Sequence, residues 1–173
     1  IKNFFILKKN IKGKKILITA GPTIEPIDPV RYLSNFSSGK QGYEIANCAY
    51  TYGAETILIT GPTNIEVPEV NKIIKVESAE QMFNESMSIC KKYGSIDIAF
   101  LTAAVSDWKI NKTEKKYKKN ENIFKQIKFT ENKDILHMIS NLKKNRPKIV
   151  CGFATETSSL INNARKKLIN KNC

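Results

Sequence analysis

The chain has 173 residues, a formal net charge of +13 and four cysteines. A chain of this length can fold as one domain that buries about two thirds of its unfolded surface, so it needs no disulfide bonds for stability. No stretch reaches the roughly 18 consecutive apolar residues of a membrane span, and the first dozen residues lack the apolar core of a signal peptide. We therefore expect a cytoplasmic protein with no membrane partner.

The positive charge raises the hypothesis of a nucleic-acid binder, because a basic surface attracts phosphate chains. The composition argues against it. Only Arg31, Arg146 and Arg165 are arginines among the 29 basic residues, and arginine forks are favoured for contacts with bases and phosphates. We expect no nucleic-acid partner and keep this hypothesis in third place. The cysteines and His137 lack metal-ligand spacing, so we predict no metal held by the protein and reduced thiols.

Apolar runs typical of buried parallel strands alternate with helical patterns along the chain. The predicted strands are 16–19, 55–60, 71–76, 96–101 and 148–152, and the predicted helices are 40–52, 79–93 (with Ser78 as N-cap), 133–143 and 158–170. This order predicts an α/β fold, with a Rossmann-like, doubly wound and mostly parallel sheet. We assign residues 1–12 to a linker or N-terminal extension and 13–173 to a single domain. We predict that residues 109–130 form a basic flap followed by a short strand.

The connection between the first strand and the helix that starts at Lys40 is the most informative segment. It has about 20 residues, far more than a usual strand-to-helix connection, and such loops are more often functional than not. Amide groups in glycine turns and at helix N-termini attract anions. The predicted phosphate-binding residues are Gly21, Thr23, Ser37, Ser38 and Gly39. The serines also suit helix capping, and Ser34 and Gln41 rule out a Walker A loop.

The same segment carries a family resemblance. Residues 21–42 read G-P-T-x-E-P-x-D-P-V-R-Y-x-S-N-x-S-S-G-K-x-G, which resembles the signature of phosphopantothenoylcysteine synthetase (phosphopantothenate cysteine ligase). Three further blocks occur in the family's order, at residues 103–108, 116–119 and 152–157. The resemblance runs from about Lys14 to Cys173. Family members continue beyond that point, so we expect a C-terminally incomplete domain.

The resemblance implies an enzyme of coenzyme A biosynthesis that joins 4'-phosphopantothenate to cysteine. In this family, CTP activates the carboxylate as an acyl cytidylate and releases pyrophosphate, and cysteine then displaces CMP. The resemblance also implies Mg2+, small-molecule substrates, a homodimer and no FMN in this chain. The alternative hypothesis is a nucleotide- or flavin-binding module without ligase activity.

Site residues follow from the resemblance as well. Lys116 is the implied cation of the first step. Lys115 is the alternative, because the segment between Asp107 and Lys116 is one residue shorter than the family pattern. Arg31 and Asn35 are implied in the transfer to cysteine, and they would share a face if the segment between them turns helically. The implied nucleotide contacts are Leu101, Thr102, Ala103, Asp107, Lys116, Lys133, Asp134, Ile135, Leu136, Phe153, Lys167 and Lys171. Without the family pattern, these residues equally indicate strand packing, a core phenylalanine and solvated charges.

Overall fold

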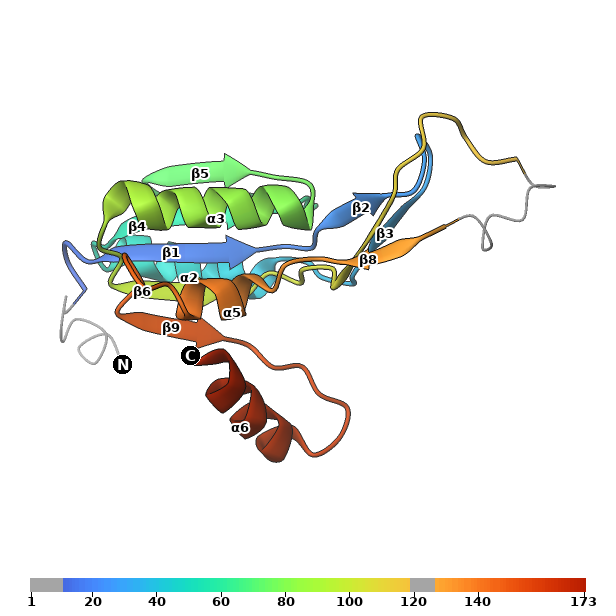
Figure 1. Ribbon diagram of the computed structural model, residues 1–173. Coiled ribbons are helices and arrows are strands. Elements are labelled where there is room, and N and C mark those ends of the chain that lie inside the picture. Colours follow the sequence, from blue (N-terminus) through green and yellow to red (C-terminus); the bar gives the residue numbers. More distant parts are fainter. Residues whose placement is uncertain (1–10, 119–126) are drawn as a thin grey trace.

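The computed structural model describes residues 11–118 and 127–173. Its centre is a sheet of five strands that all run parallel (Figure 1). The strands, in spatial order, are β5 (Lys72–Lys75), β4 (Glu55–Thr60), β1 (Lys15–Ala20), β6 (Ile98–Leu101) and β9 (Ile149–Gly152). The chain starts at the middle strand, winds outward to β5, and then crosses back to the other half. This order confirms the predicted doubly wound α/β fold.

The two faces of the sheet follow from the alternation of side chains along β1. Ile16 and Ile18 pack with Tyr43 and Ala46 of α2 (Lys40–Thr51) on one face. Leu17 joins the other face, which is covered by α3 (Ala79–Tyr93) and α5 (Ile135–Ser140). The remaining helix, α6 (Leu160–Lys171), follows β9 and has no buried residue. Among the described residues, no helix is long and apolar enough to cross a membrane.

Local signals fix the start of α3. The Ser78 hydroxyl accepts from the Gln81 N–H, and the Gln81 side chain accepts from the Ser78 N–H, which completes a capping box. The predicted N-cap is therefore confirmed. Helices α5 and α6 each begin two residues later than predicted. The predicted starts were residues 133 and 158, whereas α5 begins after the N-cap Asp134 and α6 begins after Ser159.

Two antiparallel hairpins extend beyond the carboxyl ends of the parallel strands (Figure 1). One pairs β2 (Ile24–Pro26) with β3 (Tyr32–Ser34), and the other pairs β7 (Trp108–Ile110) with β8 (Phe129–Glu131). We call them the first arm and the second arm. The predicted flap falls on the second arm, and residues 119–126 of that prediction lie outside the described residues.

Candidate active site

The loops that follow β1, β6 and β9 meet at the carboxyl edge of the sheet, where an open α/β sheet binds its ligands. They surround a cavity of 340 Å³, which we call the edge cavity. All the predicted nucleotide-binding residues except Lys116 and Lys167 line it. These are Leu101, Thr102, Ala103, Asp107, Lys133, Asp134, Ile135, Leu136, Phe153 and Lys171.

The wall of the edge cavity is held by bonds between two loops. The Thr102 hydroxyl donates to the Thr19 carbonyl over 2.6 Å, and the Ala104 N–H donates to the Gly21 carbonyl over 2.9 Å. The loop after β1 and the loop after β6 are thereby joined side by side. Small side chains at Ala103 and Ala104 leave the backbone of this wall open to the cavity.

Thr23, one of the predicted phosphate-binding residues, is buried between two loops. Its side chain is fully buried, and its hydroxyl accepts from the Ser106 N–H over 2.9 Å. The Ser106 carbonyl accepts in turn from the Asn132 side chain over 3.0 Å. Thr23 therefore ties the first arm to the cavity wall, and its role as a phosphate ligand stays a prediction.

The lysines of α6 occupy two environments. Lys171 lines the edge cavity and pairs with Asp134 over 2.8 Å. Burial raises the pKa of Asp134, but the His137 N–H and Lys171 outweigh it and hold that pKa below its usual value. Lys167 instead pairs with Glu156 over 2.6 Å, and it lines only the neighbouring apolar hollow, which Lys171 borders as well. Only Lys171 is placed to meet a ligand in the edge cavity.

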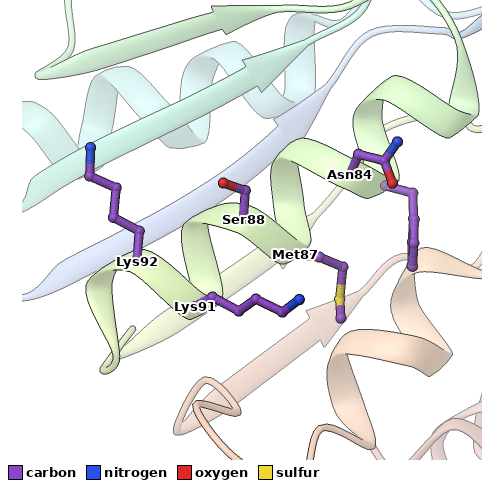
Figure 2. A pocket seen from close by; sticks show the side chains of 6 residues that line it. Asn84, Met87, Ser88, Lys91 and Lys92 are labelled. Carbon is purple, nitrogen blue, oxygen red and sulfur yellow. The ribbon is translucent and has the colours of Figure 1, made fainter.

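Lys133 is tethered to the helical layer. Its ammonium nitrogen lies 4.5 Å from the centroid of the Phe83 ring, which is a cation–π distance. Phe83 also borders a larger hollow of 670 Å³ on the outer face of α3, where Asn84, Met87 and Ser88 spread along the helix (Figure 2). None of the predicted site residues lines that hollow. We therefore place the functional site at the carboxyl edge.

Asn35 lies at the border of two cavities. Its side-chain amide donates to the carbonyls of Ala104 and Val105, which line the edge cavity, over 3.1 Å each. The same residue lines a second cavity of 570 Å³ together with Ser37 and Ser38. We call it the arm cavity. Arg31 and Asn35 would share a face only if the segment between them turned helically, and that condition is not met, because β3 runs extended between them.

The start of α2 borders both cavities, since Gln41 lines the edge cavity and Ser37 and Ser38 line the arm cavity. Gly39 has a φ of 76° and serves as the N-cap, and a Cβ there would lie 2.7 Å from the Thr63 methyl carbon. Ser38 accepts from the Lys40 N–H over 3.3 Å. Within the described residues, no side chain caps the N–H groups further into the first turn. Those N–H groups suit an anion.

Lys115 and Lys116 lie on the exposed part of the second arm and line none of the cavities described above. The structure does not choose between them. Sequence analysis also missed several cavity residues, including Thr19, Gln41 and Asn132. Their position at the end of a strand, after a strand or at a helix start was the only available signal.

A metal site built by the protein is not present among residues 11–118 and 127–173, since no three His, Cys, Asp or Glu side chains cluster there. Asp107 is exposed on the wall of the edge cavity. One carboxylate of this kind suits Mg2+ that is bound mainly by substrate phosphates.

Comparison with known proteins places the chain in a family. A family model described as the DNA/pantothenate metabolism flavoprotein C-terminal domain matches residues 11–173. The chain is 44% identical over 175 residues to the coenzyme A biosynthesis bifunctional protein CoaBC of Borreliella burgdorferi, covering 99% of this chain and 44% of that protein. It is 40% identical over 173 residues to the corresponding protein of Haemophilus influenzae, covering 99% and 42%. The chain thus spans less than half the length of these relatives.

A solved structure agrees with the sequence match. The crystal structure of the C-terminal domain of a CoaBC protein superposes with a TM-score of 0.80 at 38% identity, and the match covers 96% of this chain and 76% of that one. The chain therefore belongs to the family of the DNA/pantothenate metabolism flavoprotein C-terminal domain, the phosphopantothenoylcysteine synthetase domain that its motifs resemble.

Proposed function

We propose that the chain is a ligase of coenzyme A biosynthesis, which joins 4'-phosphopantothenate to cysteine through an acyl cytidylate made from CTP. The observation that carries the proposal is the position of Asn35, which lines the arm cavity and hydrogen-bonds the wall of the edge cavity. Two substrates held in adjacent cavities could react only at such a border. The relatives named for coenzyme A biosynthesis support a role in that process.

The edge cavity is the nucleotide site in this proposal. Phe153 offers an aromatic surface, and the backbone beside Ala103 and Ala104 offers groups for a base edge. Lys171 would exchange its Asp134 partner for a phosphate. Mg2+ would be held by Asp107 and the substrate phosphates, where it would neutralise triphosphate charge.

The arm cavity is the site of the phosphorylated acid. Ser37, Ser38 and the N-terminus of α2 would bind its phosphate, and its carboxylate would point to the border. In the first step the carboxylate oxygen attacks the α-phosphorus of CTP and pyrophosphate leaves. The Lys116 ammonium stabilises the negative charge that develops on the triphosphate during this step. In the second step the cysteine amine attacks the acyl carbon and CMP leaves, while Asn35 and Arg31 orient the acyl group.

A homodimer is part of the proposal. Val30 and Tyr32 on the first arm are exposed at 61% and 59%, and Phe36, which follows the arm in the sequence, is completely exposed. Apolar side chains gathered on one projecting arm are typical of an interface. Sedimentation at micromolar concentration should show a dimer, and a monomer alone would contradict this part.

One incubation tests the function. The protein is mixed with CTP, Mg2+, cysteine and phosphopantothenate, and pyrophosphate and CMP are measured, with an omission of phosphopantothenate as the control. Release that requires phosphopantothenate supports the ligase. CTP or flavin binding without release would favour the alternative of a binding module, and strongly salt-dependent oligonucleotide binding would favour a nucleic-acid protein.

A further inference from the structure

Asp28 is a buried carboxylate at the tip of the exposed first arm. Its residue is 3% exposed, whereas Val30, which follows two positions later, is 61% exposed. One carboxylate oxygen accepts from the backbone N–H groups of Val30 and Arg31, over 2.9 Å and 2.8 Å. The other accepts from two nitrogens of the Arg31 guanidinium, including Nε over 3.0 Å. This carboxylate therefore orients a residue predicted to act in the second half-reaction.

Asp28 also binds the second arm. The Tyr117 N–H donates over 3.3 Å to the carboxylate oxygen that also accepts from the Arg31 guanidinium. The guanidinium in turn donates to the Tyr117 carbonyl over 3.2 Å. A further bond runs from the Thr113 N–H to the Ile27 carbonyl over 3.1 Å. The segment that carries Lys115 and Lys116 is thus docked on the first arm by its backbone.

A turn-forming role alone does not account for these bonds. The contacts with the N–H groups of Val30 and Arg31 are those of an ordinary Asx turn, which an asparagine would also make. The contacts with the guanidinium and with Tyr117 reach beyond the turn and all fall on the second carboxylate oxygen, so that both oxygens must act as acceptors. A neutral amide would present N–H donors to one of these two positions.

We propose that Asp28 is a positioning residue that couples the two arms. It holds Arg31 for the transfer to cysteine, and through Tyr117 it sets the position of Lys116 for nucleotidyl transfer. The inference rests on the proposed function for its kinetic consequence. The physical link between the arms stands independently of that function.

The charge state agrees with this role. The Arg31 guanidinium, assisted by the surrounding N–H donors, holds the pKa of Asp28 well below its usual range in spite of burial. The carboxylate is therefore ionised at every pH at which the protein would work, and the coupling should not titrate near neutrality.

Asp28→Asn is the first test, and Asp97→Asn is the matched control. Asp97 is also a largely buried bridging carboxylate, which binds Lys148 over 2.7 Å and the Lys15 N–H over 2.9 Å. It lies at the amino ends of β1 and β6, away from both arms. Both variants remove one buried negative charge, but only Asp28→Asn should disturb the arms.

We expect Asp28→Asn to slow pyrophosphate release and the transfer to cysteine by about 10- to 100-fold each, the size of effect that misplaced catalytic groups produce. The KM for CTP should stay within about threefold, because the wall of the edge cavity is unchanged. Amide hydrogen exchange across residues 113–117 should accelerate. Asp97→Asn should keep both rates and the exchange of that segment.

A second variant covers the case in which Asp28→Asn fails to fold. Tyr117→Pro deletes the N–H that binds Asp28 and leaves the Asp28–Arg31 pair intact, and Glu114→Pro places a proline in the same exposed segment as a control. We expect Tyr117→Pro to slow pyrophosphate release more than the transfer to cysteine. Equal effects of the test and control variants, or unchanged exchange and rates in a folded Asp28→Asn protein, would overturn the coupling. A wild-type protein without ligase turnover would overturn the proposed function, while the exchange experiment would still decide the coupling.

Discussion

The side-chain amide of Asn35 donates to the carbonyl oxygen of Ala104 over 3.1 Å, across 69 positions of sequence. This bond joins the end of β3 to the loop after β6. It places an amide, which both donates and accepts, between the arm cavity and the edge cavity. The acyl group that passes from phosphate to amine would lie at this border in the proposed reaction.

Asn35→Asp should separate the two half-reactions. A carboxylate cannot donate to the Ala104 and Val105 carbonyls and would repel a developing oxyanion. We expect pyrophosphate release to persist, while transfer to cysteine slows by about 100- to 1000-fold, as for loss of one oxyanion donor. Mass spectrometry should then detect the accumulated acyl cytidylate.

The control for this variant is Asn64→Asp. Asn64 also lines the arm cavity, but it lies on the loop after β4, and among the described residues its side chain makes no hydrogen bond. The Asn64→Asp substitution introduces the same negative charge at a comparably exposed site. If Asn64→Asp accumulates the intermediate to the same extent, then the added charge, and not the position of Asn35, explains the effect.

Lys116→Gln should abolish formation of the acyl cytidylate, and pyrophosphate release with it. The substitution removes the ammonium and nearly keeps the side-chain length. Lys115→Gln is the matched variant, because both lysines are exposed on the same segment of the second arm. Pyrophosphate release in single-turnover experiments decides between them. Loss in Lys115→Gln alone would transfer the role to Lys115, and full activity in both would remove the flap cation from the mechanism.

Lys167 and Lys171 of α6 should differ in their effect on CTP. Lys171 lines the edge cavity, whereas Lys167 is held by Glu156 outside it. One charge-assisted hydrogen bond contributes about 1.5 to 3 kcal/mol, so Lys171→Gln should raise the KM for CTP by about tenfold or more. Lys167→Gln should change it by less than about threefold. The KM values are measured by titration with CTP. A larger increase in Lys167→Gln than in Lys171→Gln would show that α6 moves when nucleotide binds.

The parallel core could be predicted because its signals are local. The apolar run from Ile16 to Thr19 is buried as expected, and the capping box at Ser78 has a fixed spacing. The first arm was missed, and only a flap followed by a short strand was predicted for the second, for a physical reason. Strands of three residues show no measurable alternation, and prolines at positions 26 and 29 indicate a loop.

The site could be predicted only in part. The residues of the edge cavity follow from the ends of parallel strands and from the family motifs. The buried hydroxyl of Thr23 and the pairing of Lys167 with Glu156 depend on distant partners, which no local pattern encodes. The coupling through Asp28 joins residues 89 positions apart. Such a contact exists only after both arms have folded.

Asp97 predicts a specific acid dependence of stability. The Lys148 ammonium and the Lys15 N–H lower the pKa of Asp97 from 3.8 to about 2. Because the folded pKa lies below the unfolded one, the carboxylate stabilises the fold fully above about pH 4 and loses that contribution as the pH falls toward about 2. Wild-type protein should therefore be more stable than Asp97→Asn at pH 7, and the difference should shrink below about pH 4.

Urea unfolding of both proteins between pH 7 and pH 3 measures this difference. The other carboxylates titrate alike in the two proteins, so their contributions cancel in the comparison. Lys148→Met is the complementary variant, because it removes the first cause of the lowered pKa and should move the acid transition of the Asp97 contribution toward pH 4. A stability difference that stays constant over the whole range would mean that Asp97 acts only through its neutral hydrogen bonds. In that case the ion pairs with Lys14 and Lys148 would add nothing measurable at this end of the sheet.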